Sequence, residues 1–324
     1  MKRALSIPVA IGIGLAFFTV FLLVAGEPLP FKALWNMTQP YELDHRIIWA
    51  LRFPRLLLAF GIGGCLAMLG AIYQVMFNNP LAEPYVLGIS TAVTLGVVLA
   101  QFLWGVAAQS FTALGMGFLF SFFAMALIIG SYFWNSGKNL ERIVLFGMGL
   151  NFVCSSLLFT IVSYQHQNSG SHSIKWLFGN IPWLEFDQVA LLLSVILPIC
   201  LFLLLLGRHL DGLSLGDSVA RTLGYSPHHS RITLLILSSV LLSLISALTG
   251  AIGFVGLVVP HCIRLLLCPR SSRYLLSFSF LGGAFFLALS DCVSRSVIVP
   301  LEIPIGVVTT LLGGPVFLYL LWKK

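Results

Sequence analysis

Ten apolar runs, each about as long as a membrane-spanning helix, constrain the fold of this chain more than any other feature. A helix needs roughly 20 mostly apolar residues to cross the hydrocarbon core of a bilayer. Short polar segments, or segments marked by proline and glycine, separate the runs. The runs lie near residues 7–25, 56–76, 86–106, 111–134, 143–164, 189–207, 232–249, 252–268, 275–292 and 305–322. The sequence therefore predicts an all-α, polytopic membrane protein with about ten transmembrane helices, folded as a single transmembrane domain over residues 1–324.

Composition indicates that lipid surrounds these helices. Hydrophobic residues make up 58% of the chain and charged residues only 9%, whereas a soluble domain carries about 25% charged residues. The apolar runs are also continuous, while the strands of a membrane barrel alternate between apolar and polar residues over about ten positions. Both observations favour helices that face lipid.

The positions of the basic residues predict the orientation in the membrane. Placing the N-terminus in the cytoplasm puts most of the 18 lysines and arginines on the cytoplasmic side, as the positive-inside rule requires. The first run follows Lys2 and Arg3 but lacks a clear small-x-small cleavage site, so we expect a retained helix rather than a signal peptide. An even number of helices returns the C-terminus to the cytoplasm. Topology accounts for the net charge of +7, and we expect membrane lipid but no nucleic acid as a partner.

Motifs for catalysis or metal binding are missing from the sequence. The six cysteines show no C-x-x-C spacing, the histidines form no H-E-x-x-H motif, and neither a Walker A motif nor a nucleophile elbow occurs. We therefore expect no catalytic site, metal or cofactor in this chain. Any energy source must come from another protein.

Two arginines, Arg52 and Arg55, precede or begin the second apolar run on the predicted outer side. Arginines at membrane edges commonly extend their head groups into the polar interface. Arginines on the side that usually lacks basic residues also suggest a docking patch for an acidic partner. The residues alone leave both interpretations open.

A turn-rich segment over residues 77–90 separates the second run from the third. Its prolines, Pro80 and Pro84, interrupt the helix and free backbone groups. At membrane depth such groups are tolerated only beside protein or a water-filled path. The segment is therefore a candidate gate.

The longest predicted cytoplasmic loop contains a short amphipathic helix. Ser214 followed by Asp217 resembles a capping box, and Leu215, Val219 and Leu223 recur at helical spacing. Such a helix could lie on lipid, but its polar face carries few basic residues. Docking to a cytoplasmic subunit is the better interpretation.

Four segments together resemble a known family, the FecCD-type permease subunits of type II ABC importers. They are Arg52–Gly88, Leu213–Gly224, Gly250–Arg264 and Glu302–Thr309. The similarity extends in the same order over nearly the whole chain. It implies the fold of a vitamin B12 importer permease, a place in the bacterial inner membrane, and import of a ferric siderophore, haem or a cobalamin-like metal chelate. It also implies a second permease subunit that forms a homodimer with the first, two cytoplasmic ATPases that use ATP and Mg, and a periplasmic or lipid-anchored binding protein.

The resemblance also assigns roles to individual residues. Arg52, Arg55 and Arg295 match arginines that meet glutamates of the binding protein, and Asn79 and Leu81 match the cytoplasmic gate. The loop 211–230 matches the coupling-helix loop that fits a cleft on the ATPase. Its matching residues are Leu213, Leu215, Gly216, Asp217, Ala220, Arg221, Leu223 and Gly224.

A secondary transporter driven by an ion gradient is the alternative to an ATP-driven importer. Such transporters usually place carboxylates or broken helices near the middle of the membrane. Here Asp291 is the main ionisable candidate within an apolar run, and Arg295 follows it one turn later. We expect these two side chains to form an intrahelical ion pair.

Overall fold

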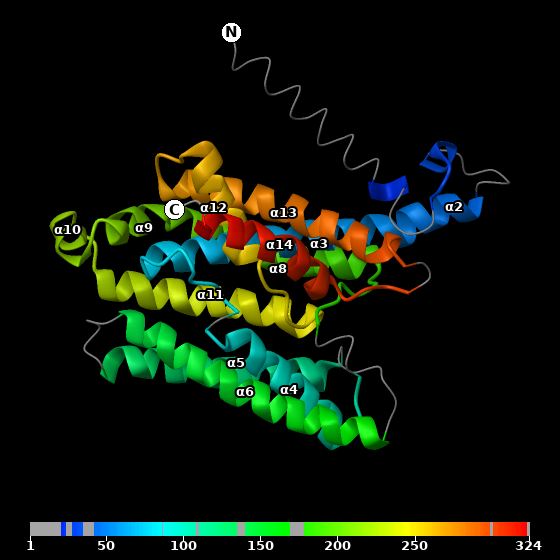
Figure 1. Cartoon of the computed structure of the whole chain (residues 1–324), viewed down its shortest axis with the longest axis horizontal. Helices are drawn as coiled ribbons and strands as arrows, with labels where there is room; N and C mark the ends of the chain where they lie inside the picture. Colours follow the sequence, from blue (N-terminus) through cyan, green and yellow to red (C-terminus); the bar gives the residue numbers. More distant parts are fainter. Residues whose placement is uncertain are drawn as a thin grey trace, which may run out of the picture.

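The computed structural model describes residues 21–23, 28–34, 42–85, 87–107, 110–134, 140–168, 178–298 and 301–322. All regular elements within these residues are helices (Figure 1). The first are η1 (Phe31–Leu34), α2 (Glu42–Arg46), η2 (Ile47–Arg52), α3 (Phe53–Met76), α4 (Ile89–Trp104), α5 (Phe111–Trp134) and α6 (Leu140–Asn168). The others are α8 (Phe186–Leu205), α9 (Gly207–Ser214), α10 (Asp217–Thr222), α11 (Pro227–Thr249), α12 (Val255–Leu267), α13 (Ser272–Ser296) and α14 (Ile305–Trp322).

Helices occupy nine of the ten predicted apolar runs. Six of the described helical spans are long and apolar enough to cross a membrane, and α4, α12 and α14 contain shorter apolar helices. The all-helical, polytopic prediction is therefore confirmed. The predicted first run, 7–25, lies outside the described residues except at 21–23.

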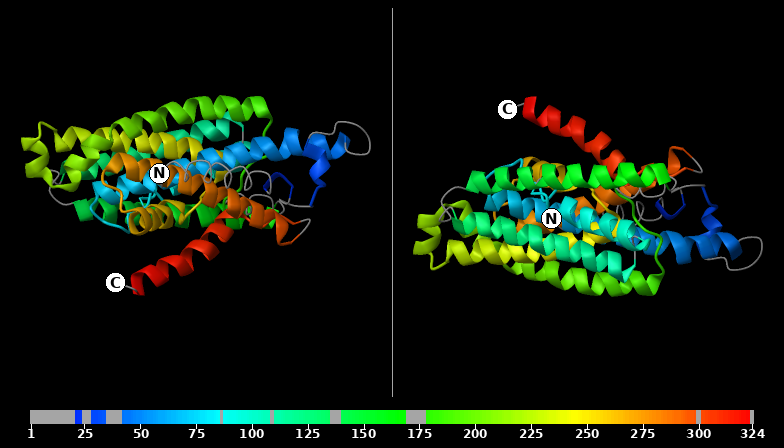
Figure 2. Two further views of the ribbon diagram at one scale, coloured as in Figure 1. Left: turned by 90° about the horizontal axis from the view of Figure 1, so that it is seen from above. Right: turned by 90° about the horizontal axis from the view of Figure 1, so that it is seen from below.

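The helices form two groups with α11 between them. In Figure 1, α4, α5 and α6 lie on one side of α11, while α3, α12 and α13 lie on the other. The most extensive helix–helix contacts are those of α3 with α13 and of α4 with α5, and α11 contacts α3, α4 and α5. Figure 2 shows that α14 diverges from both groups toward its C-terminal end. The elements α2 and α10 lie at opposite ends of the molecule (Figure 1).

Helices α3 and α13 approach so closely that their backbones touch. A Cβ atom added at Gly283 would overlap the carbonyl oxygen of Gly63 and the methyl group of Ala67. Ala59 and Ala71 continue the same fully buried stripe on α3. Small residues allow such contacts between membrane helices, where dispersion rather than a hydrophobic driving force holds the helices together.

Gly283→Ala is therefore expected to destabilise the protein, because the two backbones must separate to admit a methyl group. Overpacking of this kind costs about 1–3 kcal/mol, and we expect a lower midpoint of thermal unfolding in detergent. Gly130→Ala is the matched control, since a Cβ atom at this position on α5 meets nothing within 4 Å. Equal midpoints for the two variants would contradict the proposed backbone contact.

A side chain from α3 satisfies the backbone where proline interrupts α12. Pro260 has no N–H group, so the carbonyl of Gly256 loses its usual partner within the helix. The Gln74 amide donates to this carbonyl at 3.1 Å and to that of Leu257 at 3.2 Å. Arg264 in turn donates to the Gln74 side-chain oxygen. This network fixes α12 to the end of α3, directly before the candidate gate.

Candidate docking, gating and coupling sites

A cluster of four charged side chains lies at the α2 end of the bundle, and we call it the arginine cluster. Arg55 comes from the first turn of α3, Asp291 and Arg295 from the last turns of α13, and Glu302 from the segment before α14. Arg55 donates to Asp291 through Nη2 at 2.9 Å and Nε at 3.2 Å, and to both carboxylate oxygens of Glu302 at 3.2 Å. The cluster therefore holds two cations and two carboxylates.

Asp291 is the centre of the arginine cluster. Its second oxygen lies 2.9 Å from Arg295, which confirms the predicted intrahelical ion pair. The side chain of Asp291 is fully buried. The ring of Trp183 covers the Arg55 guanidinium at 4.2 Å and lies 5.5 Å from that of Arg295. Two cations and an aromatic ring thus enclose one buried carboxylate.

All three predicted docking arginines are buried in the free chain. The exposed fractions are 5% for Arg52, 1% for Arg55 and 5% for Arg295. Arg52 donates to the carbonyls of Leu22 at 2.8 Å and Leu23 at 3.1 Å, at the end of the first apolar run. These contacts differ from the interfacial extension that arginines at membrane edges commonly adopt. Docking at these residues stays a prediction, and it requires that the guanidinium groups become accessible.

The predicted gate forms a compact turn after α3. The side-chain oxygen of Asn79 accepts a hydrogen bond from the backbone N–H of Leu81 at 2.9 Å, and its carbonyl accepts one from Ala82 at 3.1 Å. Leu81 is exposed, whereas Ala82 and Glu83 are buried. Asn79 therefore shapes the turn, and Leu81 is the apolar side chain that the turn presents.

A cavity of about 340 Å³ lies beside this turn. It is lined by Glu83, Tyr85, Phe178, Ala251, Gly253, Phe254, Gly306, Val307, Thr310 and Leu311. The short helices α4 and α12, with 16 and 13 residues, reach only about 24 and 20 Å at 1.5 Å per residue. Irregular backbone precedes each of these helices, and such backbone is tolerated at membrane depth where it lines a cavity. The turn, which includes Glu83, was predicted from the sequence, but only the fold brings Glu83 to the same cavity as Phe254.

The predicted coupling helix differs from the structure in two respects. The single short helix predicted through Leu215, Val219 and Leu223 is interrupted, because α9 ends at Ser214 and α10 begins at Asp217. Gly216 between them has φ of +96°, in the left-handed region that favours glycine. The predicted capping box is also wrong: Gly216 occupies the position before α10, and the Ser214 hydroxyl donates to the carbonyl of Asp211 inside α9.

The residues predicted for ATPase coupling separate into two faces. Leu215, Val219 and Leu223 are exposed by 61%, 39% and 56%, whereas Leu213 and Ala220 are buried. The helix pair therefore packs on the bundle with one face and presents three apolar side chains on the other. Gly224, like Gly216, adopts a positive φ and ends the segment.

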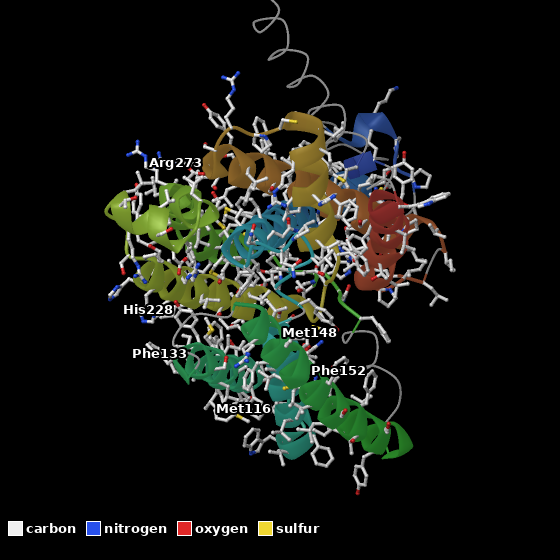
Figure 3. All side chains as sticks on the ribbon, turned by 60° about the vertical axis from the view of Figure 1, so that its left-hand side comes forward. Met116, Phe133, Met148, Phe152, His228 and Arg273 are labelled. Carbon is white, nitrogen blue, oxygen red and sulfur yellow. The ribbon has the colours of Figure 1, made fainter. Side chains whose placement is uncertain are left out.

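A bidentate ion pair joins α10 to α11. Arg231 donates to the two carboxylate oxygens of Asp217 at 2.6 and 2.9 Å, and Arg231 is only 5% exposed. The Arg231 guanidinium holds the pKa of the Asp217 carboxyl below its usual range. One turn earlier on α11, His228 stacks on Tyr132 at 5.1 Å and meets Phe133 edge-on (Figure 3). The start of α11 thus contacts both α10 and α5.

The fold and these sites define an α-helical membrane protein of the transporter class. The chain belongs to the FecCD transport family, whose sequence model matches residues 13–323. It is 35% identical over 300 residues to the hemin transport system permease protein HmuU of Yersinia pestis, covering 91% of this chain and 89% of that protein. It is also 35% identical over 326 residues to the vitamin B12 import system permease protein BtuC of Serratia proteamaculans, covering 99% and 93%.

Solved structures also resemble this fold. An inward-facing structure of a metal-chelate type ABC transporter matches with a TM-score of 0.82 and 29% identity, over 98% of this chain and 99% of that chain. PsaBC from Streptococcus pneumoniae matches with a TM-score of 0.57 and 20% identity, over 86% and 93%. At that identity the second likeness concerns the fold alone.

Proposed function

We propose that this chain is the permease subunit of an ATP-driven importer that moves a metal chelate from an external binding protein into the cytoplasm. The observation that carries this proposal is the end-to-end similarity to permeases named for hemin and vitamin B12 import. In this proposal the chain binds no cofactor and catalyses no reaction, and partner subunits use ATP and Mg. The chelate is a ferric siderophore, haem or a cobalamin-like compound.

The exposed face of α9 and α10 supports the proposed contact with two cytoplasmic ATPases. Leu215, Val219 and Leu223 form an apolar surface at the end of the bundle opposite α2. In the proposed orientation this end and both termini lie in the cytoplasm of a bacterium, and the chain spans its inner membrane. The arginine cluster then faces the periplasm, where a soluble or lipid-anchored binding protein would dock.

Helix α14 supports the proposed second permease subunit. Its first turns are buried, but Leu311, Leu318 and Tyr319 are exposed by 69%, 67% and 58%, and the helix diverges from the bundle (Figure 2). The cavity beside the gate borders the same helix through Thr310 and Leu311. A second copy of this chain against α14 would enclose a pathway between the two subunits.

Reconstitution tests the proposal against a transporter driven by an ion gradient. Proteoliposomes that contain the permease, its ATPase and the binding protein should accumulate hemin, cobalamin or a ferric siderophore only when ATP is present. Uptake should survive an uncoupler. Uptake without ATPase that collapses with the uncoupler would instead support the secondary transporter.

Asp217→Asn is expected to loosen α10 from α11 and to lower the amount of chelate moved per ATP hydrolysed. The ATPase should remain bound, because the exposed leucines are unchanged. The double variant Asp217→Arg with Arg231→Asp, which reverses the pair, should restore part of the lost transport. Unchanged transport per ATP in Asp217→Asn would show that the ion pair plays no part in coupling.

The same ion pair predicts how stability depends on pH. Because the folded-state pKa of Asp217 is lowered, its contribution is present above the ordinary carboxyl pKa and disappears as pH falls through the folded value. The midpoint of thermal unfolding should therefore fall less on acidification in Asp217→Asn than in the native chain.

A further inference from the structure

The guanidinium group of Arg55 is occupied on both of its binding edges before any partner arrives. One edge, formed by Nε and Nη2, binds Asp291 at 3.2 and 2.9 Å. The other edge, formed by Nη1 and Nη2, binds Glu302 at 3.2 Å through each atom. A planar guanidinium can bind one carboxylate on each such edge. A third carboxylate can therefore form a bidentate pair with Arg55 only by replacing one of these two.

The two carboxylates differ in their surroundings. The Asp291 side chain is fully buried and also pairs with Arg295, whereas the Glu302 side chain is 36% exposed. Glu302 belongs to the segment between α13 and α14, in which its neighbour Ile303 is tied to α13 through the backbone and hydroxyl of Ser294. Glu302 is therefore the outer carboxylate of the arginine cluster.

The cost of removal also differs. Separating Asp291 from Arg55 would remove one of the two cations that pair with this fully buried carboxylate, which is strongly unfavourable. Replacing Glu302 by another carboxylate keeps the charge of the cluster constant, and the displaced side chain can move into water. Replacing Glu302 on Arg55 therefore costs less free energy than replacing Asp291.

We propose that Glu302 occupies the position of the partner's carboxylate, and that an acidic side chain of the binding protein replaces Glu302 on Arg55 during docking. This inference rests on the proposed function. Asp291 keeps Arg55 in place throughout. Glu302 then acts as an internal competitor that masks the cation in the free permease, and the docking surface consists of the Glu302 edge of Arg55 and the adjoining ring of Trp183.

Chemical modification of Arg55 tests the masking without any binding protein. In the purified transporter in nanodiscs, Glu302→Gln should raise the rate at which phenylglyoxal modifies Arg55 severalfold, as measured by mass spectrometry of the peptide. Glu302→Ala gives a second variant that removes the competing group entirely. Glu42→Gln is the matched control, because Glu42 pairs with the exposed Arg46 on α2.

Affinity for the binding protein tests the exchange. Glu302→Gln should tighten binding about tenfold, which corresponds to ~1.4 kcal/mol, while Glu42→Gln should leave it unchanged. Faster modification with unchanged or weaker affinity would overturn the exchange and the docking role of Arg55. Unchanged modification in both Glu302 variants would overturn the masking. If the native transporter does not respond to a binding protein at all, the proposed function itself fails.

Discussion

A chain that carries glutamate in place of Arg55 is expected not to reach a stable folded state. The substitution would bring a third carboxylate beside Asp291 and Glu302 and would leave Asp291 buried with Arg295 as its remaining cation in the cluster. Removing one partner of a buried ion pair costs about 3–5 kcal/mol, and like charges add to this loss. Whole domains are stable by only about 5–15 kcal/mol. We expect aggregation or a large loss of monodisperse protein in size-exclusion chromatography after detergent extraction.

Arg46→Glu provides the control for this experiment. Arg46 lies on the same side of the molecule, but its side chain is 74% exposed and pairs only across one turn with Glu42. An exposed pair of this kind contributes about 0–1 kcal/mol, so the variant should elute as the native protein does. A monodisperse Arg55→Glu variant with native thermal stability would show that the arginine cluster does not hold α3 to α13. Because Arg55 is structural, loss of transport in Arg55→Glu does not by itself identify a docking residue.

Replacing both Leu215 and Leu223 by aspartate is expected to detach the ATPase from the permease. Both side chains are exposed in the free chain, so the change should leave the permease folded. Burial of one leucine in an interface is worth about 1.5–3 kcal/mol, and a buried aspartate adds a desolvation cost. The combined loss exceeds a hundredfold in affinity, since each 1.4 kcal/mol is a factor of about ten. Copurification of the ATPase with the tagged permease measures the effect.

Leu43→Asp is the matched control for this second prediction. Leu43 on α2 is 69% exposed and lies at the opposite end of the molecule. This variant should retain the ATPase in full. Normal copurification with the Leu215 and Leu223 double variant would place the ATPase contact elsewhere on the chain.

Local sequence patterns predicted the features of this fold that depend on local spacing. Apolar run length located the spanning helices, and the separation of one turn between Asp291 and Arg295 predicted their ion pair. The bonds from Arg55 to Asp291 join residues 236 positions apart. No local pattern shows which distant carboxylate an arginine meets once helices pack. Arg55 therefore lies buried in the arginine cluster, and Arg52 lies buried against the carbonyls of Leu22 and Leu23.

The break between α9 and α10 had a weak signal in the sequence. Leu215, Val219 and Leu223 recur at helical spacing and favour one continuous helix, and this regularity concealed the interruption. Gly216 followed by Asp217 is also typical of a helix start, because glycine is accepted before the first turn and an acidic residue favours it. Leu215, Val219 and Leu223 are nevertheless all exposed. They lie directly before, within and directly after α10.

The backbone contact between Gly63 and Gly283 has a consequence for how the permease can move. Most helix pairs can slide a little, because side chains change rotamer and fill the space that opens. Where two peptide backbones touch, no side chain stands between them to take up a displacement. Helices α3 and α13 should therefore move as one rigid body. We expect the backbone amides at the interface between them to exchange with deuterium at the same slow rate in every state of the transport cycle. Relative movement is expected instead where side chains separate the helices, as between α11 and α5, which meet through the hydroxyls of Ser243 and Ser121.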